Sequence, residues 1–108
     1  MAYELHVERK VKTETAISTE EWIEFVEADP DLQFAGVISS SFEGHEVSYD
    51  NPLAVRWTGH PFIDYVFFDF RVGSVVAKNP DEIIIEKLKV IANSLESQVV
   101  GDDGEIYN

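Results

Sequence analysis

Residues 65–78, Tyr-Val-Phe-Phe-Asp-Phe-Arg-Val-Gly-Ser-Val-Val-Ala-Lys, decide the fold class of this chain. In the first half of this stretch Val66, Phe68 and Phe70 alternate with a second set of residues, which is the period of a strand with two different faces. Val72-Gly73-Ser74 then supplies a tight turn, because glycine readily adopts the positive φ that short hairpins need. The stretch therefore predicts an antiparallel hairpin of two strands, 64–72 and 74–78.

The sequence on either side of this hairpin predicts more antiparallel strands. Strict alternation, or a short β-rich run between turn formers, places these strands near 3–10, 32–39, 45–49 and 53–58. Residues 39–44 are polar and contain a glycine, so we expect an exposed hairpin loop there. Residues 98–107 predict a last hairpin across an Asp-Gly turn.

A first helix is predicted after Ile17 by its start signals. Ser18 and Glu21 have the spacing of a capping box, in which each side chain bonds the backbone amide of the other residue. Ile17 and Trp22 occupy the two positions of a hydrophobic staple around this cap. Pro30 prevents the helix from continuing, so we expect it to end near Asp29.

A second helix is predicted from residue 79 onward. Asn79 is a favoured N-cap residue and Pro80 suits the first helical position. At 100° per residue one broad arc of the helix is apolar, and it is formed by Ile84, Ile85, Leu88, Ile91, Ala92 and Leu95. We expect this arc to pack on the sheet.

These elements predict a single α+β domain over residues 1–108, mostly antiparallel sheet with two helices packed on one face. A chain of 108 residues has room for one hydrophobic core. Two helices cannot cover both faces of the sheet, so Tyr65 and Phe67 are expected on the uncovered side. Aromatic anchors ringed by polar groups suit a protein partner or a second copy of the chain, unless a loop or the C-terminal hairpin folds over them.

The composition excludes several functions. The chain has 21 acidic and 8 basic residues, a formal net charge of -13, and such a surface repels the phosphate backbone of nucleic acids. It has no cysteine, which excludes disulfides, thiolate metal sites and a cysteine nucleophile. The N-terminus lacks a basic region before an apolar run, and no stretch reaches the roughly 20 apolar residues of a membrane span. A cytoplasmic protein that binds neither nucleic acid nor membrane is expected.

The charge is concentrated on the first predicted helix. Glu20, Glu24 and Glu27 fall within about 60° of one another on a helical wheel, and Asp31 follows shortly after them. One hypothesis is that this acidic surface steers a basic protein partner toward the helix. The alternative is that it is a solvated face that keeps the protein soluble. We take these four carboxylates, together with Tyr65 and Phe67, as the candidate partner-binding residues.

A second candidate site is the segment Trp57-Thr58-Gly59-His60-Pro61, with Asp64 shortly after it. An imidazole beside a carboxylate on such a loop is suited to general base chemistry, so Trp57, His60 and Asp64 form an alternative ligand or catalytic site. The competing interpretation is structural, with His60 bonding backbone carbonyls and capping the loop.

The sequence predicts no metal site and no cofactor. The three histidines, His6, His45 and His60, do not have the helical spacing of metal ligands, and His6 is expected to be a solvated or cross-strand residue. The acidic run 102–105 lacks the loop of alternating ligands that binds calcium, and a hairpin turn explains it better. No glycine-rich phosphate-binding motif occurs.

Three segments carry a resemblance to known proteins: residues 57–61, the run Lys78-Asn79-Pro80-Asp81-Glu82, and the run Gly101-Asp102-Asp103-Gly104-Glu105-Ile106-Tyr107. They resemble a group of small acidic bacterial proteins of uncharacterised function. Their size and acidity are similar to those of immunity proteins, which neutralise secreted or contact-delivered bacterial toxins. The resemblance implies no particular functional residue, because these motifs are turns and helix caps.

The sequence as a whole favours a non-enzymatic acidic binding protein, most concretely an immunity-type inhibitor of a basic bacterial toxin. Nuclease toxins are basic because they hold phosphate, so an acidic inhibitor can imitate the charge of the substrate. The alternatives are a small enzyme or ligand-binding domain around His60 and Asp64, or a structural homodimer formed through Tyr65 and Phe67.

Overall fold

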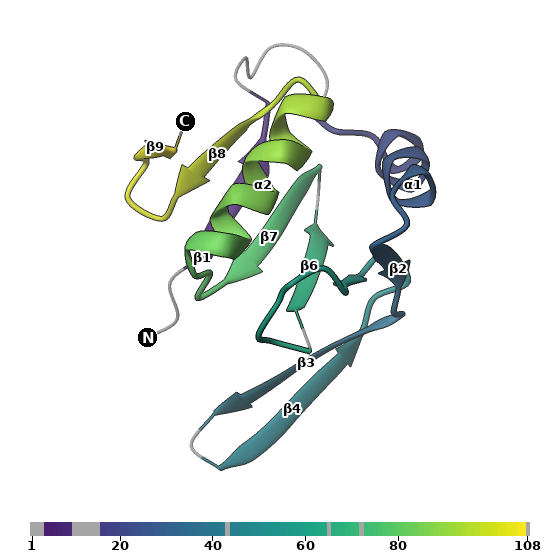
Figure 1. The fold of residues 1–108 in the computed structure, drawn as a ribbon, viewed down its shortest axis with the longest axis vertical. Coiled ribbons are helices and arrows are strands. Elements are labelled where there is room, and N and C mark those ends of the chain that lie inside the picture. Colours follow the sequence, from purple (N-terminus) through teal and green to yellow (C-terminus); the bar gives the residue numbers. More distant parts are fainter. Residues whose placement is uncertain (1–3, 10–15, 43, 65, 72, 108) are drawn as a thin grey trace.

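The computed structural model describes residues 4–9, 16–42, 44–64, 66–71 and 73–107, and it shows the single compact α+β domain that the sequence predicts (Figure 1). The strands are β1 (Glu4–Glu8), β2 (Leu32–Phe34), β3 (Val37–Phe42), β4 (His45–Asp50), β5 (Val55–Trp57), β6 (Val66–Arg71), β7 (Ser74–Lys78), β8 (Gln98–Gly101) and β9 (Ile106–Tyr107). The helices are α1 (Thr19–Ala28) and α2 (Glu82–Ser94).

Within the described ranges, seven strands form one antiparallel sheet in the order β2-β5-β6-β7-β1-β8-β9. The N-terminal strand β1 lies between β7 and β8, with Leu5 opposite Ala77 on one side and opposite Gly101 on the other. This insertion brings β1 beside the hairpin of β8 and β9. The predicted hairpin of β6 and β7 is confirmed, and Gly73 in its turn has a φ of +79°.

Both helices pack on the same face of this sheet, as predicted. In Figure 1, α2 lies across β1 and β7, and α1 lies beside β2 at the other end of the sheet. The alternation of the strands directs Val7, Phe68 and Val75 into one core with Trp22 of α1 and Leu88 of α2. Each of these five side chains is fully buried, which at roughly 1.5–3 kcal/mol per large apolar side chain makes this layer the main source of stability.

The first helix begins as its sequence predicts. The Ser18 hydroxyl accepts from the Glu21 amide at 3.1 Å, and the Glu21 carboxylate accepts from the Ser18 amide at 3.0 Å, which completes the capping box. Trp22 stacks on Phe70 of β6 with ring centroids 5.7 Å apart, and its indole N–H donates to the Leu53 carbonyl at 2.9 Å. The cap and this buried indole together fix which face of α1 points outward.

Two expectations for residues 32–44 are wrong. The strand expected over 32–39 is divided between β2 and β3, because Gly36 has a φ of +74° and turns the chain out of the main sheet. The loop expected over 39–44 is largely strand, since β3 continues to Phe42 and pairs with β4. These two strands form a separate ribbon that projects away from the helices in Figure 1.

The start of the second helix also differs from the expectation. Asp81 is the N-cap, and its carboxylate accepts from the Ile84 amide at 2.8 Å. Asn79 has a φ of +46° and belongs to the turn before the helix. Pro80 is therefore not the first residue of α2, which begins at Glu82. The reason is that Asp81 is an equally good cap, and the turn after β7 occupies the two residues before it.

Candidate functional site

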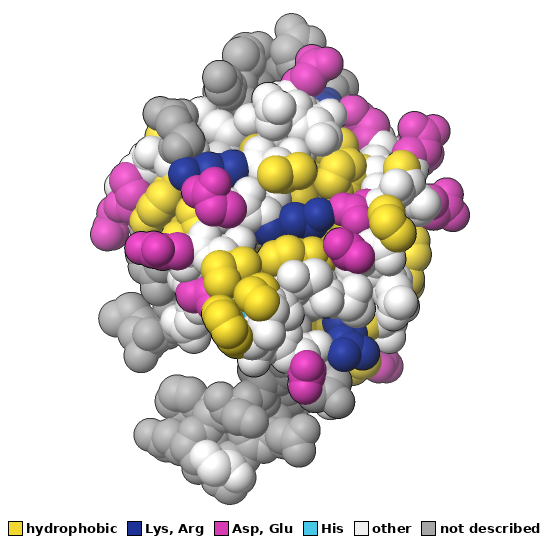
Figure 2. All heavy atoms as spheres, in the orientation of Figure 1, with side chains coloured by type: hydrophobic (Ala, Val, Ile, Leu, Met, Phe, Trp, Pro, Cys, Tyr) yellow, Lys and Arg dark blue, Asp and Glu magenta, His cyan; other side chains and the backbone are white. Residues whose placement is uncertain are grey.

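The outward face of α1 carries the three carboxylates that the sequence singles out. Glu20, Glu24 and Glu27 are exposed, and none of them forms an ion pair with any residue in the described ranges. Acidic side chains stand along the right-hand edge of Figure 2, where α1 lies. We call Glu20, Glu24 and Glu27 the acidic ridge. Glu27 also lies in the last turn of a helix that has no basic residue there, so its charge adds to the negative end of the helix dipole.

Glu21, on the adjoining side of α1, is held by a cation. Its carboxylate lies 2.5 Å from the Arg9 guanidinium, which also donates to the Leu95 carbonyl at the end of α2. Hydrogen bonds from the Arg9 side chain and the Ser18 amide lower the pKa of Glu21 to about 2. Arg9 therefore fastens the start of α1 to the end of α2.

Asp29 and Asp31 follow the ridge and differ from each other. The Asp29 carboxylate lies 2.5 Å from Lys87 of α2, and although burial raises its pKa, the bonds from Lys87 and the Asp31 amide outweigh burial and lower it. Asp31 is exposed, and its backbone carbonyl accepts from the Thr58 amide at 2.9 Å. Of the two, Asp31 is the one whose carboxylate adds to the exposed acidic surface.

The predicted aromatic anchors are only partly described. Tyr65 lies outside the described residues, and Phe67 is half-buried opposite Arg56 on the face of the sheet away from the helices. Part of that face is covered, because Asn51 after β4 donates to the carboxylate of Asp69. Phe62 is strongly exposed, with 83% of its surface accessible.

The imidazole of His60 holds its own loop in place through hydrogen bonds. Nδ1 accepts from the amides of Phe62 and Ile63 at 3.0 and 3.1 Å, so Nε2 carries the proton and donates to the Asp81 carboxylate at 2.7 Å. The structural interpretation expected bonds to carbonyls, whereas the partners are amides. The His60 side chain is 1% exposed, and Trp57 packs against it edge to face with ring centroids 5.9 Å apart.

The carboxylate that contacts His60 is Asp81, not Asp64. Asp64 is exposed, and its backbone carbonyl accepts from Arg56 at 2.8 and 3.0 Å. Bonds from the Ile84 amide and then from His60 lower the pKa of Asp81 despite the opposing effect of burial. The structure thus places Trp57 and His60 together but ties them to the N-cap of α2, and both imidazole nitrogens are already engaged.

A shallow groove of about 430 Å³ lies elsewhere, between α2 and the β8–β9 hairpin. Its lining includes Glu86, Val90, Ser97, Val99 and Tyr107, and none of the residues predicted for a site contributes to it.

Sequence reasoning missed the polar network on the face of the sheet away from the helices. Asp69 is 4% exposed and accepts from Asn51 and from Arg71. Arg71 also lies 3.6 Å from the Glu4 carboxylate of β1. The only signal was the alternation that placed Asp69 and Arg71 on this face, since their partners come from distant parts of the chain.

Comparison with protein-family models, with curated proteins and with solved structures found no match to this chain. In the described parts of the chain, neither helix has the length and apolar character needed to cross a bilayer.

Proposed function

We propose that this protein is a non-enzymatic binding protein whose acidic ridge docks a basic protein partner. The observation that supports the proposal is a contrast within one helix. Glu21 and the neighbouring Asp29 are neutralised by Arg9 and Lys87, whereas the ridge carboxylates have no such partner among the described residues.

The ridge is unfavourable for α1 itself. Glu20 and Glu24 are four residues apart, and Glu24 and Glu27 three apart, so they repel one another by a few tenths of a kcal/mol per pair. Glu27 also opposes the helix dipole. A stability-optimised helix would place a base at its C-terminal end, so this arrangement favours a role in recognition.

The electrostatic consequence is a negative field over α1 on a protein with a formal net charge of -13. Complementary fields raise association rates by roughly 10- to 1,000-fold and lose that advantage as salt screens the charges. In its most specific form the partner is a basic toxin domain and the protein is an immunity-type inhibitor. The acidic surface then imitates the phosphate that the toxin holds.

The test begins with co-purification from the native host, followed by stopped-flow association of the recovered partner. We expect Glu24→Lys with Glu27→Lys to slow association at least tenfold at low salt. The matched control is Asp50→Lys with Asp103→Lys, which changes the net charge by the same amount at exposed positions outside the ridge. We expect the control to slow association less than about threefold.

Three outcomes count against the proposal. The first is a protein that is recovered alone, the second is an association rate that does not depend on salt, and the third is an equal effect of the ridge and control variants. The immunity-type form adds a requirement of its own. The partner must have an activity that the wild-type protein inhibits and the ridge variant does not.

A further inference from the structure

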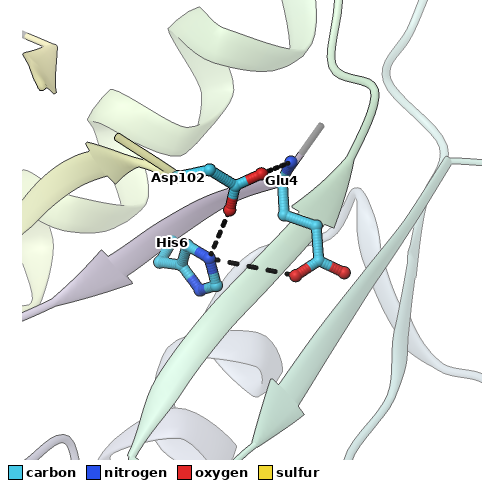
Figure 3. Close-up of side chains that lie close together, drawn as sticks. All are labelled: Glu4, His6 and Asp102. Carbon is cyan, nitrogen blue, oxygen red and sulfur yellow. Dashed lines mark hydrogen bonds and ion pairs between the residues drawn. The ribbon is translucent and has the colours of Figure 1, made fainter. Parts of the chain in front are cut away.

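A second cluster lies on the face of the sheet away from the helices, where β1 meets the turn after β8. Glu4 and His6 point to the same side of β1, and Asp102 follows β8 directly (Figure 3). The imidazole Nε2 lies 3.4 Å from Asp102 Oδ1 and 3.9 Å from Glu4 Oε1. One ligand atom from each of the three residues lies within 4.8 Å of the other two.

The contact of His6 with Asp102 is a long hydrogen bond, the contact with Glu4 is longer still, and a shared metal ion suits both separations. Charge-assisted N–H···O bonds are typically about 2.7–2.9 Å long, shorter than either contact of His6. Zinc binds imidazole nitrogen and carboxylate oxygen at about 2.0–2.2 Å, which in a tetrahedral arrangement places two ligand atoms about 3.4 Å apart. The contact between His6 and Asp102 has this spacing, and the contact with Glu4 is 0.5 Å longer.

The far oxygen of each carboxylate is already engaged. Asp102 Oδ2 accepts from the Glu4 backbone amide at 2.9 Å, and Glu4 Oε2 lies 3.6 Å from Arg71. The near oxygens, Oδ1 and Oε1, are therefore the ones that face the imidazole in Figure 3. Outer contacts of this kind orient the ligands of metal sites.

The strands fix the distance between the two halves of the cluster. Leu5 of β1 is in register with Gly101 of β8. Glu4 and His6 flank Leu5, and Asp102 follows Gly101, so this pairing brings the three residues close together. The three side chains are partly exposed, at 23% for Glu4, 28% for His6 and 39% for Asp102. An ion can reach them from solvent, and the backbone of β1 is paired on both sides, with β7 and with β8.

We propose that Glu4, His6 and Asp102 bind a divalent transition-metal ion, with Zn²⁺ the best match. One imidazole and two carboxylates suit zinc, whereas Ca²⁺ and Mg²⁺ prefer oxygen ligands alone. Three protein ligands leave a fourth position for water or for a ligand from another molecule. The bound ion joins β1 to the β8–β9 turn, and this proposal is independent of the function of the acidic ridge.

The experiment is a calorimetric titration of tag-free protein with Zn²⁺ in an excess of Mg²⁺, which occupies scattered surface carboxylates. We expect one site in the wild-type protein, with affinity reduced at least tenfold in His6→Ala and in Asp102→Asn. Asp103→Asn, one residue further along the same turn, is the control and is expected to bind within twofold of wild type. Co²⁺ absorption provides a second readout, since intense visible bands indicate four-coordination.

All variants are first compared by circular dichroism and thermal unfolding without metal, so that a loss of binding is not a loss of fold. Equal affinity of wild type, His6→Ala and Asp102→Asn would overturn the proposal. So would a titration that fits only several weak sites, or zinc binding abolished by excess Mg²⁺.

Discussion

The regions around His60 and His6 are built in opposite ways. His60 is enclosed, accepts from two amides and donates to Asp81, so each of its nitrogens has a partner at 3.1 Å or less. His6 lies on a partly exposed sheet face, with two carboxylates at 3.4 and 3.9 Å. The first imidazole stabilises a loop, whereas the second has longer contacts and lies in the cluster that we propose binds a metal ion.

This difference shows why residue type and local spacing are weak guides to a site. His60 stands in a conspicuous turn near Asp64, yet its contacts are those of a structural residue. His6 stands in a regular strand, where we expected a solvated or cross-strand residue, and it meets two carboxylates. The two imidazoles differ in how short their contacts are, and this difference separates the structural residue from the proposed metal ligand.

The carboxylates of α1 also differ in whether other groups bond them. Glu21 is bonded by Arg9 and by the Ser18 amide, while Glu24 and Glu27 point to solvent. We regard the bonded groups as parts of the scaffold and the exposed groups as the recognition surface. The predictions below test this division.

The largest effect is expected from His60→Ala. It leaves the amides of Phe62 and Ile63 without their acceptor and opens a space beside Trp57, so we expect the free energy of unfolding to fall by about 2 kcal/mol. His6→Ala is the matched comparison, with an expected change below about 0.5 kcal/mol in the absence of metal. Urea unfolding measures both. Equal losses in the two variants would remove the distinction between the histidines.

A smaller, pH-dependent effect is expected from Glu21. Its pKa is about 2 in the folded protein against an ordinary 4.5, so its contribution to stability is complete above about pH 4.5 and is lost as pH falls toward 2. The Glu21 side chain is 42% exposed, so solvent screening limits this contribution to about 1 kcal/mol.

The measurement is the difference in unfolding free energy between wild type and Glu21→Gln from pH 2 to pH 7. We expect the difference to shrink as pH falls from 4.5 to 2, because the wild-type carboxylate becomes protonated. Glu24→Gln is the control, since no cation in the described residues holds that carboxylate. A difference for Glu21→Gln that stays constant across this pH range contradicts the assignment.

The smallest effect, of opposite sign, is expected from Glu27→Lys. The change removes repulsion with Glu24 and places a cation at the negative end of α1, so we expect stability to rise by about 0.3–0.5 kcal/mol. Association with the basic partner should slow at the same time. Thermal unfolding and stopped-flow association rates are measured on the same preparation. Together they show whether the acidic ridge lowers the stability of α1 and speeds association with the partner. A loss of stability would mean that Glu27 has a structural role.

Much of the fold was predictable because its signals are local. The alternation in 65–78 and the capping box at Ser18 each act over a few residues, and the structure confirms both. The same local signals misplaced the N-cap of α2, since Asn79 and Asp81 are both good caps and the choice depends on the turn after β7. The strand expected over 32–39 was divided for a similar reason, because a single glycine redirected the chain into a second ribbon.

The sequence alone determined a small, strongly acidic α+β domain and the concentration of carboxylates on one helical face, because composition and helical period require no knowledge of distant contacts. The tertiary structure decided which charged groups find partners. Arg9 reaches α1 and α2 together, His60 reaches Asp81, and His6 meets a carboxylate 96 residues away. These contacts depend on strand order and register, since β1 inserts between β7 and β8, and no local pattern in the chain specifies that insertion.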